Sequence, residues 1–341
     1  MRGICGPRSI PSLGPLRVLF LANYAPDFPD FAVKPYDGDG GYPDYHHDLF
    51  TALKKIGLKV WSTSKPYAIH FARGNVDYVF SLMNRMPILN SEIFVSSYCE
   101  FARIPYLGAR PNIRALAEDK YLTKLSAQSL GLPVAPGLPF ASGGILPKDA
   151  PFEGSFFVKN RFGAASEGIS EKNLCRDWRS AAHLAQKMAA NGDEVLVERF
   201  CEGIDITVPV LGGPEPMVLG FIHTKSNKIE NIVTEDLKLD DPLGNEVVDV
   251  GGMQDDFLSD IAALWRAFGP MDYFRADYRV DLETKQRWLL EINICCYLGN
   301  EGAICLAAEQ HGLSQLDVLN YVIGYSLERQ KFMRQQCKWV L

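Results

Sequence analysis

Two short segments near the C-terminus constrain the fold of this chain more than any other part of the sequence. The segment Tyr-Phe-Arg-Ala-Asp-Tyr-Arg-Val-Asp at 273–281 and the segment Arg-Trp-Leu-Leu-Glu-Ile-Asn at 287–293 both alternate polar and apolar side chains. This alternation predicts a hairpin of two antiparallel strands with its turn centred on Thr284. One face of the hairpin would pack on the core. That face would carry Ala276, Tyr278, Val280, Trp288, Leu290 and Ile292.

The other face of the hairpin carries four polar side chains that suggest a metal site. In this register Asp277 lies opposite Glu291, and Arg275 lies opposite Asn293. Two opposed carboxylates repel each other unless a cation or a proton lies between them. Oxygen ligands without His or Cys favour magnesium, which also takes water and phosphate oxygens as ligands. A solvated polar face, neutralised by Arg275 and Arg279, is the alternative interpretation.

A loop upstream of the hairpin has the composition of a phosphate-binding loop. Residues 155–159 predict a strand that ends at Lys159, and the loop from Asn160 to Ser170 follows it. Small side chains in this loop leave backbone N–H groups open to an anion. The loop has neither the ending of a P-loop nor the spacing of a dinucleotide fingerprint, so a plain surface hairpin is the alternative. The small residues are Gly163, Ala164, Ala165, Ser166 and Gly168.

Composition and charge exclude several classes of protein. The chain has 341 residues, 47% of them hydrophobic and 22% charged, which is typical of a soluble globular protein of about two domains. The net charge of −6 and the lack of a long basic run argue against a nucleic-acid partner. The apolar runs are far shorter than the roughly 20 residues of a membrane helix, so no membrane partner is expected. The eight cysteines lack paired CxxC motifs, which favours reduced thiols.

The pattern of strands and helices divides the chain into four segments. Glycines and prolines interrupt residues 1–15, which we expect to be a flexible leader of a cytoplasmic protein. Alternating strands and helices over 16–110 predict a doubly wound α/β domain with a parallel sheet. An α+β pattern over 111–212 predicts a central subdomain. Residues 213–341 would form a C-terminal subdomain that contains the metal site.

The loop, the hairpin and the segments around them resemble, in order, the motifs of the ATP-grasp superfamily and, within it, the D-alanine–D-alanine ligase group. The similarity runs from about residue 104 to residue 330. The resemblance implies an α/β, ATP-grasp fold, in which the N-terminal parallel-sheet domain precedes two α+β subdomains that sandwich ATP. The matching motifs are Ile104–Gly108, Glu118–Lys124 with Gly131–Pro133, Val195–Phe200 with Glu202–Gly203, Arg275–Asp277, and Leu290–Asn293.

The resemblance also implies roles for the matching residues. Lys120 and Lys159 would hold the ATP phosphates, and Arg275 and Ser166 would be catalytic, with Arg275 stabilising the developing oxyanion. Adenine and ribose would contact a second group of residues, namely Glu198, Phe200, Cys201 and Asp205. Two magnesium ions, replaceable by manganese, would bind the hairpin residues Asp277, Glu291 and Asn293.

Three segments that should face the substrates depart from the ligase pattern: 23–45, 84–92 and 295–301. Glu92 and Glu301 are the candidate substrate contacts in them. We therefore expect an ATP-dependent ligase that joins a small-molecule carboxylate to an amine, with substrates other than D-alanine and specialised metabolism as a setting. D-alanine ligation, a small-molecule kinase and a noncatalytic nucleotide-binding regulator are the alternatives. A homodimer is compatible with the sequence.

Overall fold

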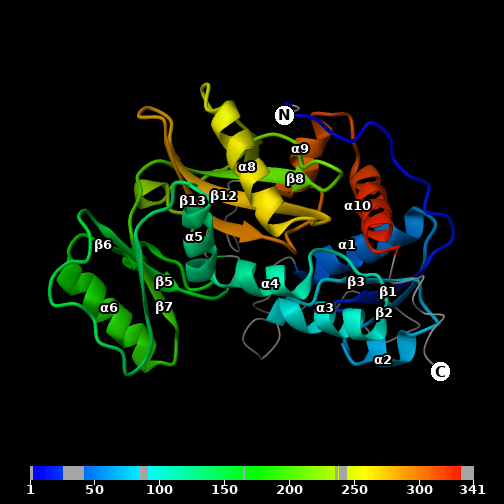
Figure 1. The fold of residues 1–341 in the computed structure, drawn as a ribbon, viewed down its shortest axis with the longest axis horizontal. Helices are drawn as coiled ribbons and strands as arrows, with labels where there is room; N and C mark the ends of the chain where they lie inside the picture. The colour runs from blue at the N-terminus through cyan, green and yellow to red at the C-terminus, as the bar shows by residue number, and fades with distance from the viewer. Residues whose placement is uncertain are drawn as a thin grey trace.

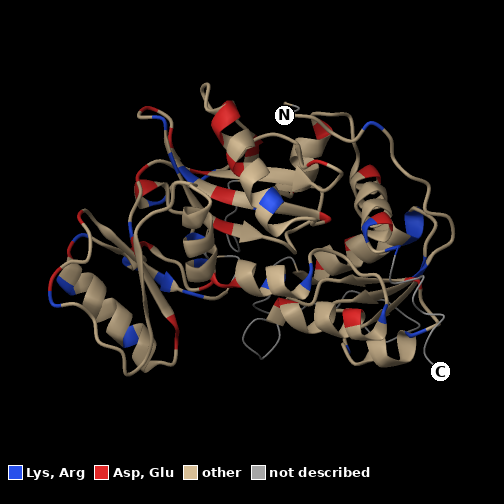
Figure 2. Ribbon diagram, viewed as in Figure 1, with Lys and Arg blue, Asp and Glu red and all other residues tan. Residues whose placement is uncertain are grey.

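The computed structural model describes residues 3–25, 42–84, 91–163, 166–234, 237 and 244–331. In these residues three β-sheets lie side by side with helices packed against them (Figure 1). Acidic and basic residues are interspersed along the ribbon rather than collected on one element (Figure 2). No helix in the described ranges is long and apolar enough to cross a membrane.

The first sheet is parallel, as the sequence predicts, with the order β2-β1-β3. Alternate residues of its central strand enter two cores: Val18 and Phe20 lie in one, and Leu19 and Leu21 in another. Both faces are therefore covered, which is typical of parallel sheets. The elements of this region are β1 (Arg17–Leu21), α1 (Tyr42–Lys55), β2 (Lys59–Thr63), α2 (Ala68–Ala72), β3 (Tyr78–Ser81) and α3 (Ser91–Ala102).

The second sheet is antiparallel with the order β4-β7-β5-β6. Its helix α6 (Trp178–Ala190) packs on one face through the small buried residues Ala181, Ala185 and Ala189. Asp177 caps the N-terminus of this helix, because its carboxylate accepts a hydrogen bond from the backbone N–H of Ser180 at 2.9 Å. The strands are β4 (Gly137–Phe140), β5 (Phe156–Asn160), β6 (Leu174–Cys175) and β7 (Val195–Arg199), and the 3-10 helix η1 (Glu171–Asn173) precedes β6.

The third sheet has the order β11-β10-β8-β12-β13, with β9 paired to β8. Helix α8 (Gln254–Phe268) covers one face, where Phe257 packs edge-on against Tyr278 with ring centroids 5.0 Å apart. The strands are β8 (Ile204–Leu211), β9 (Met217–Val218), β10 (Ile222–Thr224), β11 (Asn245–Val247), β12 (Tyr273–Asp281) and β13 (Gln286–Asn293). The remaining helices are α4 (Pro111–Glu118), α5 (Lys120–Ser129), η2 (Ile229–Asn231), α9 (Ala303–Glu309) and α10 (Gln315–Arg329).

The predicted hairpin is β12 and β13, and its predicted register is correct only at the end far from the turn. Asp277 pairs with Glu291, but Tyr278 pairs with Leu289, because a β-bulge follows Asp277. On the turn side of the bulge, the side chains of β13 point to the opposite faces from those we predicted. The predicted core positions of Trp288 and Leu290 are therefore wrong. Leu289 is buried beside Tyr278, and Leu290 lines a cavity instead.

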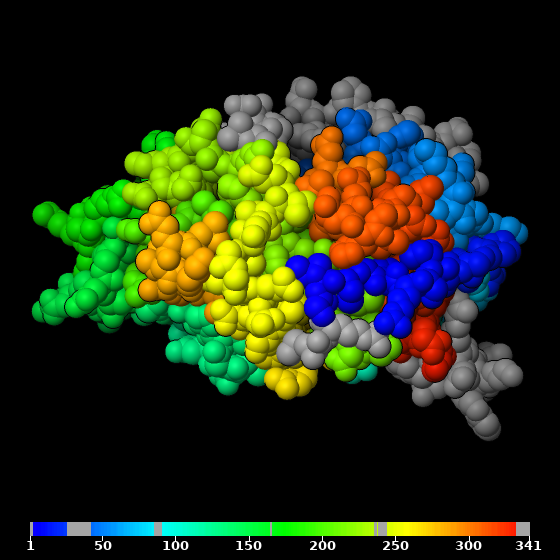
Figure 3. Space-filling view, turned by 90° about the horizontal axis from the view of Figure 1, so that it is seen from above, coloured from blue at the N-terminus to red at the C-terminus, as the bar shows by residue number. Residues whose placement is uncertain are grey.

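The N-terminal segment lies across the C-terminal part of the chain (Figure 3). The backbone N–H of Cys5 donates to the carbonyl of Val218 in β9 at 2.9 Å. Pro11 lies so close to Gly324 in α10 that a Cβ at position 324 would clash with it. The boundaries of the leader and of the three domains remain predictions from the sequence.

The turn between β7 and β8 depends on a glycine, which gives a testable prediction. Gly203 has φ +118°, and a Cβ there would meet the carbonyl of Val280. Gly192 has φ +99°, but a Cβ there would meet no atom within 4 Å. We expect Gly192→Ala to lower the free energy of unfolding by about 1 kcal/mol and Gly203→Ala by about 2–4 kcal/mol, since a steric clash adds to the strain. Denaturant unfolding measures both, and equal losses would contradict the close approach at Gly203.

Candidate active site

A cavity of about 510 Å³ lies between the second and third sheets and extends to α1. Its walls come from β5 and β7 on one side and from β8, β12 and β13 on the other. Every residue that the sequence singled out as a site residue lines this cavity. The chain thus brings together residues from position 92 to position 301, although the role of each one stays a prediction.

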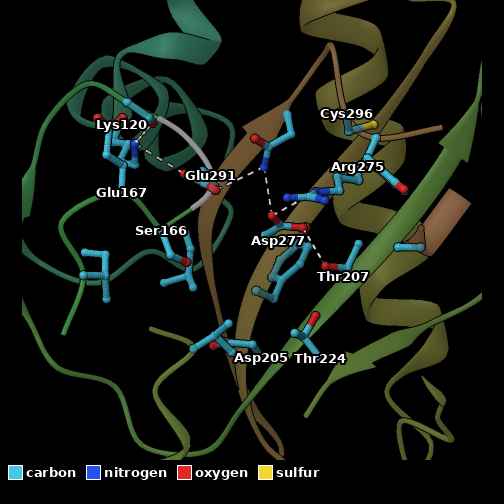
Figure 4. A pocket seen from close by; sticks show the side chains of 18 of the residues that line it. Lys120, Ser166, Glu167, Asp205, Thr207, Thr224, Arg275, Asp277, Glu291 and Cys296 are labelled. Carbon is cyan, nitrogen blue, oxygen red and sulfur yellow. Dashed lines mark hydrogen bonds and ion pairs between the residues drawn. The ribbon is translucent and has the colours of Figure 1, made fainter. Parts of the chain in front are cut away.

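Two carboxylates of the hairpin lie close together in the cavity (Figure 4). Asp277 and Glu291 are direct partners in the register of β12 and β13. The side-chain amide of Asn293 joins them, because its Nδ2 donates to Asp277 Oδ2 at 2.8 Å and to Glu291 Oε1 at 3.1 Å. From β8, the Thr207 hydroxyl donates to Asp277 Oδ1 at 2.8 Å. Three neighbouring strands therefore fix the two carboxylates.

Positive side chains face these carboxylates. Arg275 Nε lies 3.2 Å from Asp277 Oδ2, and Lys120 Nζ lies 3.6 Å from Glu291 Oε2. Burial acts to raise the pKa of Glu291, but the charges of Lys120 and Lys159 outweigh it and lower this pKa to about 2. Glu291 is therefore ionised at neutral pH and able to bind a cation.

The oxygen atoms of the hairpin suit a hard divalent cation. Asp277 and Glu291 offer carboxylate oxygens, and Asn293 would offer a third oxygen once its amide rotates, because its nitrogen now faces both carboxylates. In the described part of the chain no three His, Cys, Asp or Glu side chains gather into a metal site. An octahedral cation held by these hairpin oxygens would have further coordination positions for water and for phosphate oxygens, as magnesium sites that also bind a nucleotide commonly do.

Two lysines enter the cavity from different elements. Lys120 begins α5, and the preceding Asp119 caps this helix by accepting two backbone N–H groups, both at 3.0 Å. The ammonium of Lys120 also donates to the carbonyl of Gly163. Lys159 lies on β5, where it pairs with Leu196 of β7. The loop that we predicted to bind phosphate thus contacts Lys120, which we also predicted to bind phosphate.

Glu198 lies between two lysines. Its Oε1 is 2.5 Å from Lys159 Nζ, and its Oε2 is 3.1 Å from Lys124 Nζ. The side chain of Glu198 is only 4% exposed, and in the described structure Oε2 lacks a well-aligned hydrogen-bond donor. Both carboxylate oxygens of Glu198 thus have a lysine ammonium within 3.1 Å, and the predicted contact of Glu198 with the adenine amino group stays a prediction. The sequence analysis missed the contact with Lys124.

Arg279 joins the residues predicted to contact adenosine. Its guanidinium donates to the carbonyl of Cys201 at 3.1 Å and to Asp205 Oδ1 at 2.9 Å. It also lies over the ring of Phe200, 5.4 Å from the centroid. The sequence analysis treated Arg279 only as a neutralising charge. The sequence feature that could have identified Arg279 as a site residue is its position two residues after Asp277, on the same face of the strand.

Ser166 and Glu301 come from loops that border the cavity. Ser166 has a left-handed backbone with φ 60°. Glu301 is exposed in the turn before α9, and its backbone carbonyl accepts from Asn245 Nδ2 at 3.2 Å. Parts of the segments that we expected to face the substrates, 26–41 and 85–90, lie outside the described residues.

Glu92 belongs to a buried polar cluster in the cavity wall. Its carboxylate is 3.8 Å from Arg114 Nη1, and the same nitrogen donates to Cys295 Sγ at 2.6 Å. Burial raises the pKa of Glu92 to about 7 even though the charge of Arg114 opposes this shift. The sequence analysis assigned no role to Arg114, because this residue is 181 positions from Cys295 and no local pattern indicates their contact.

Aromatic side chains line the end of the cavity at α1. All but one lie in segments that we expected to face the substrates, although the sequence analysis assigned no role to any of them. They are Tyr42, Tyr45 and His46 on α1 and Tyr297 after β13. The rings of Tyr45 and Tyr297 are stacked with centroids 4.1 Å apart. His46 is 4% exposed, and within the described structure its Nδ1 has no hydrogen-bond partner. Burial lowers the pKa of His46 to about 4, which keeps the ring neutral at pH 7.

The buried carboxyl of Glu92 gives a prediction about pH. Its pKa is about 7 when folded and 4.5 without burial, so its stabilising proton is fully present below pH 4.5 and is lost as the pH rises through about 7. We expect Glu92→Gln, which cannot ionise, to remove a decline in the free energy of unfolding of at most about 3 kcal/mol. Denaturant unfolding between about pH 5 and pH 8 measures this decline. An unchanged slope in the variant would show that Glu92 does not cause it.

Comparisons with known proteins point to one family. No model of a protein family matches the chain. A D-alanine–D-alanine ligase of Stutzerimonas stutzeri (strain A1501) is 30% identical over 237 residues, which are 67% of this chain and 71% of that protein. A D-alanine–D-alanine ligase of Carboxydothermus hydrogenoformans is 23% identical over 300 residues, 83% of this chain and 93% of that protein.

Solved structures confirm the fold. The D-alanine–D-alanine ligase from Bacillus anthracis complexed with ATP matches with a TM-score of 0.72 at 15% identity, over 93% of this chain and 99% of that one. The D-alanyl-alanine synthetase A from Vibrio cholerae matches with a TM-score of 0.69 at 15% identity, over 93% of this chain and 100% of that one. The predicted ATP-grasp fold is therefore correct, and the chain belongs to the D-alanine–D-alanine ligase family.

Proposed function

We propose that the cavity binds ATP with magnesium and joins a carboxylate to an amine through an acyl phosphate. The enzyme class is that of the family, ATP-dependent ligases that form carbon–nitrogen bonds. The observation that carries the proposal is the meeting, in one cavity, of the Asp277–Glu291 pair with the cations Lys120, Lys159 and Arg275. Such carboxylates suit a metal, and such cations suit phosphates.

The proposed reaction has two steps. A carboxylate oxygen of the first substrate attacks the γ-phosphorus of ATP, the bond from this phosphorus to the bridging oxygen breaks, and ADP leaves. The amine of the second substrate attacks the carbonyl carbon of the acyl phosphate, and phosphate leaves as the amine nitrogen loses a proton. Magnesium, when bound, neutralises charge on the transferring group. Lys120 and Lys159 hold the phosphates, and Arg275 faces the developing oxyanion.

Glu291 tests the metal assignment. Glu291→Gln keeps the shape of the side chain but removes one of the two carboxylates, so we expect ADP release to fall by about 100-fold or more at saturating magnesium. Glu283→Gln is the matched control, because Glu283 lies exposed in the turn of the same hairpin. Unchanged ADP release in a folded Glu291→Gln variant would refute the assignment.

We further propose that the substrates are larger than D-alanine and belong to specialised metabolism. The aromatic side chains of Tyr45, His46 and Tyr297 form one end of the cavity, and aromatic walls favour substituents bulkier than a methyl group. Glu301 at the border adds negative charge, which suits an amine or a guanidine better than a carboxylate. The shape and the charge of this end of the cavity therefore support the proposed substrates.

A substrate panel tests the proposed specificity. We expect negligible ADP release with D-alanine alone, and release at least about tenfold faster with aromatic amino acids, with condensed products detected by mass spectrometry. Tyr297→Ala should shift the preference towards small substrates, whereas Tyr67→Ala, a change at an exposed tyrosine before α2, should not. Efficient condensation of two D-alanines would refute the specificity and leave the ligase chemistry intact.

A further inference from the structure

We infer that Lys124 is a positioning residue of the nucleotide site, which holds Glu198 and so leaves the charge of Lys159 available to the ATP phosphates. The inference rests on the proposed function, because it needs a nucleotide in the cavity. It concerns a lysine to which the sequence patterns assign no role.

Three buried groups form the arrangement behind this inference. Lys124 of α5, Glu198 of β7 and Lys159 of β5 have side chains that are 3%, 4% and 10% exposed. The Nζ of Lys124 lies 3.1 Å from one carboxylate oxygen of Glu198, and the Nζ of Lys159 lies 2.5 Å from the other. Of these three, Lys159 and Glu198 line the cavity, whereas Lys124 approaches Glu198 from α5 and packs against Gly137 of β4. Lys124 is thus placed to contact the carboxylate and not the nucleotide.

The charges explain why two lysines are needed. A buried carboxylate with a single lysine forms a neutral pair, and breaking that pair leaves a buried charge without a partner. If Lys159 were the only partner of Glu198, the pair would resist the approach of Lys159 to a phosphate. With Lys124 present, the three groups carry a net charge of +1, and Glu198 keeps a partner when Lys159 turns to the nucleotide.

The two other described lysines of the cavity, Lys120 and Lys225, have carboxylate partners of their own. Lys225 Nζ lies 2.8 Å from Glu246 Oε2. Lys120 faces Glu291, 3.6 Å away, and its ammonium also donates to the loop carbonyl of Gly163 (Figure 4). The pKa shifts agree with a shared carboxylate. Burial opposes the ionisation of Glu198, yet the charges of Lys124 and Lys159 together lower its pKa.

The test is the affinity of the full-length protein for a nonhydrolysable ATP analogue with magnesium, measured by calorimetry. We expect Lys124→Met to raise the Kd by about tenfold or more, and Lys124→Arg to restore most of the affinity. Lys187→Met is the control, because Lys187 is an exposed lysine on α6. Circular dichroism checks that each variant is folded.

A second pair of variants separates positioning from packing. In the Glu198→Gln background no carboxylate needs a partner, so Lys124→Met should change the Kd by less than about twofold. This comparison also holds if Lys124→Met alone fails to fold. Equal losses of affinity in both backgrounds, or no loss in either, would refute the inference and leave the proposed function standing. Absence of nucleotide binding by the wild-type protein would refute both.

Discussion

The backbone pairing of β12 with two neighbours determines where the site can form. This strand lies inside the third sheet, with β8 on one side and β13 on the other. The two registers place Thr207, Asp277 and Glu291 in one row across three strands. The next row pairs Asp205 with Arg279. A slip by one residue would turn every such side chain towards the core, so the hydrophobic packing under α8 also fixes the polar face.

The charges in the cavity come from both walls and depend on each other. The hairpin supplies two carboxylates and two arginines, Arg275 and Arg279, while α5 and β5 supply the lysines that face the carboxylates. Lys120 and Lys159 keep Glu291 ionised in spite of its burial. These interactions cross the boundary between the second and third sheets. The ionisation of the site therefore depends on how the two sheets are placed relative to each other. A nucleotide phosphate would enter a cavity in which the charged side chains that set the electrostatic field are already in place.

The sequence predicted the parts of the site that follow from local periodicity and from motifs. Two-residue alternation was enough to bring Asp277 opposite Glu291, and the motifs were enough to find the lysines. It could not predict the bulge after Asp277, because the extra residue, Leu290, is an ordinary apolar residue. The sequence patterns also could not predict contacts between residues that are far apart in the chain. Five elements lie between α5, which carries Lys124, and β7, which carries Glu198, and the contact of these residues depends on how α5 packs beside β7 and β4.

The β-bulge has a consequence for how this hairpin could vary among relatives. Because the register changes at the bulge, the carboxylate end and the turn end of the hairpin are paired independently. An insertion or deletion of one residue in the turn would alter the pairing only between the turn and the bulge. The carboxylates, held from the other side by β8, would keep their positions. Evolution can therefore lengthen or shorten this turn without changing the chemistry at its base.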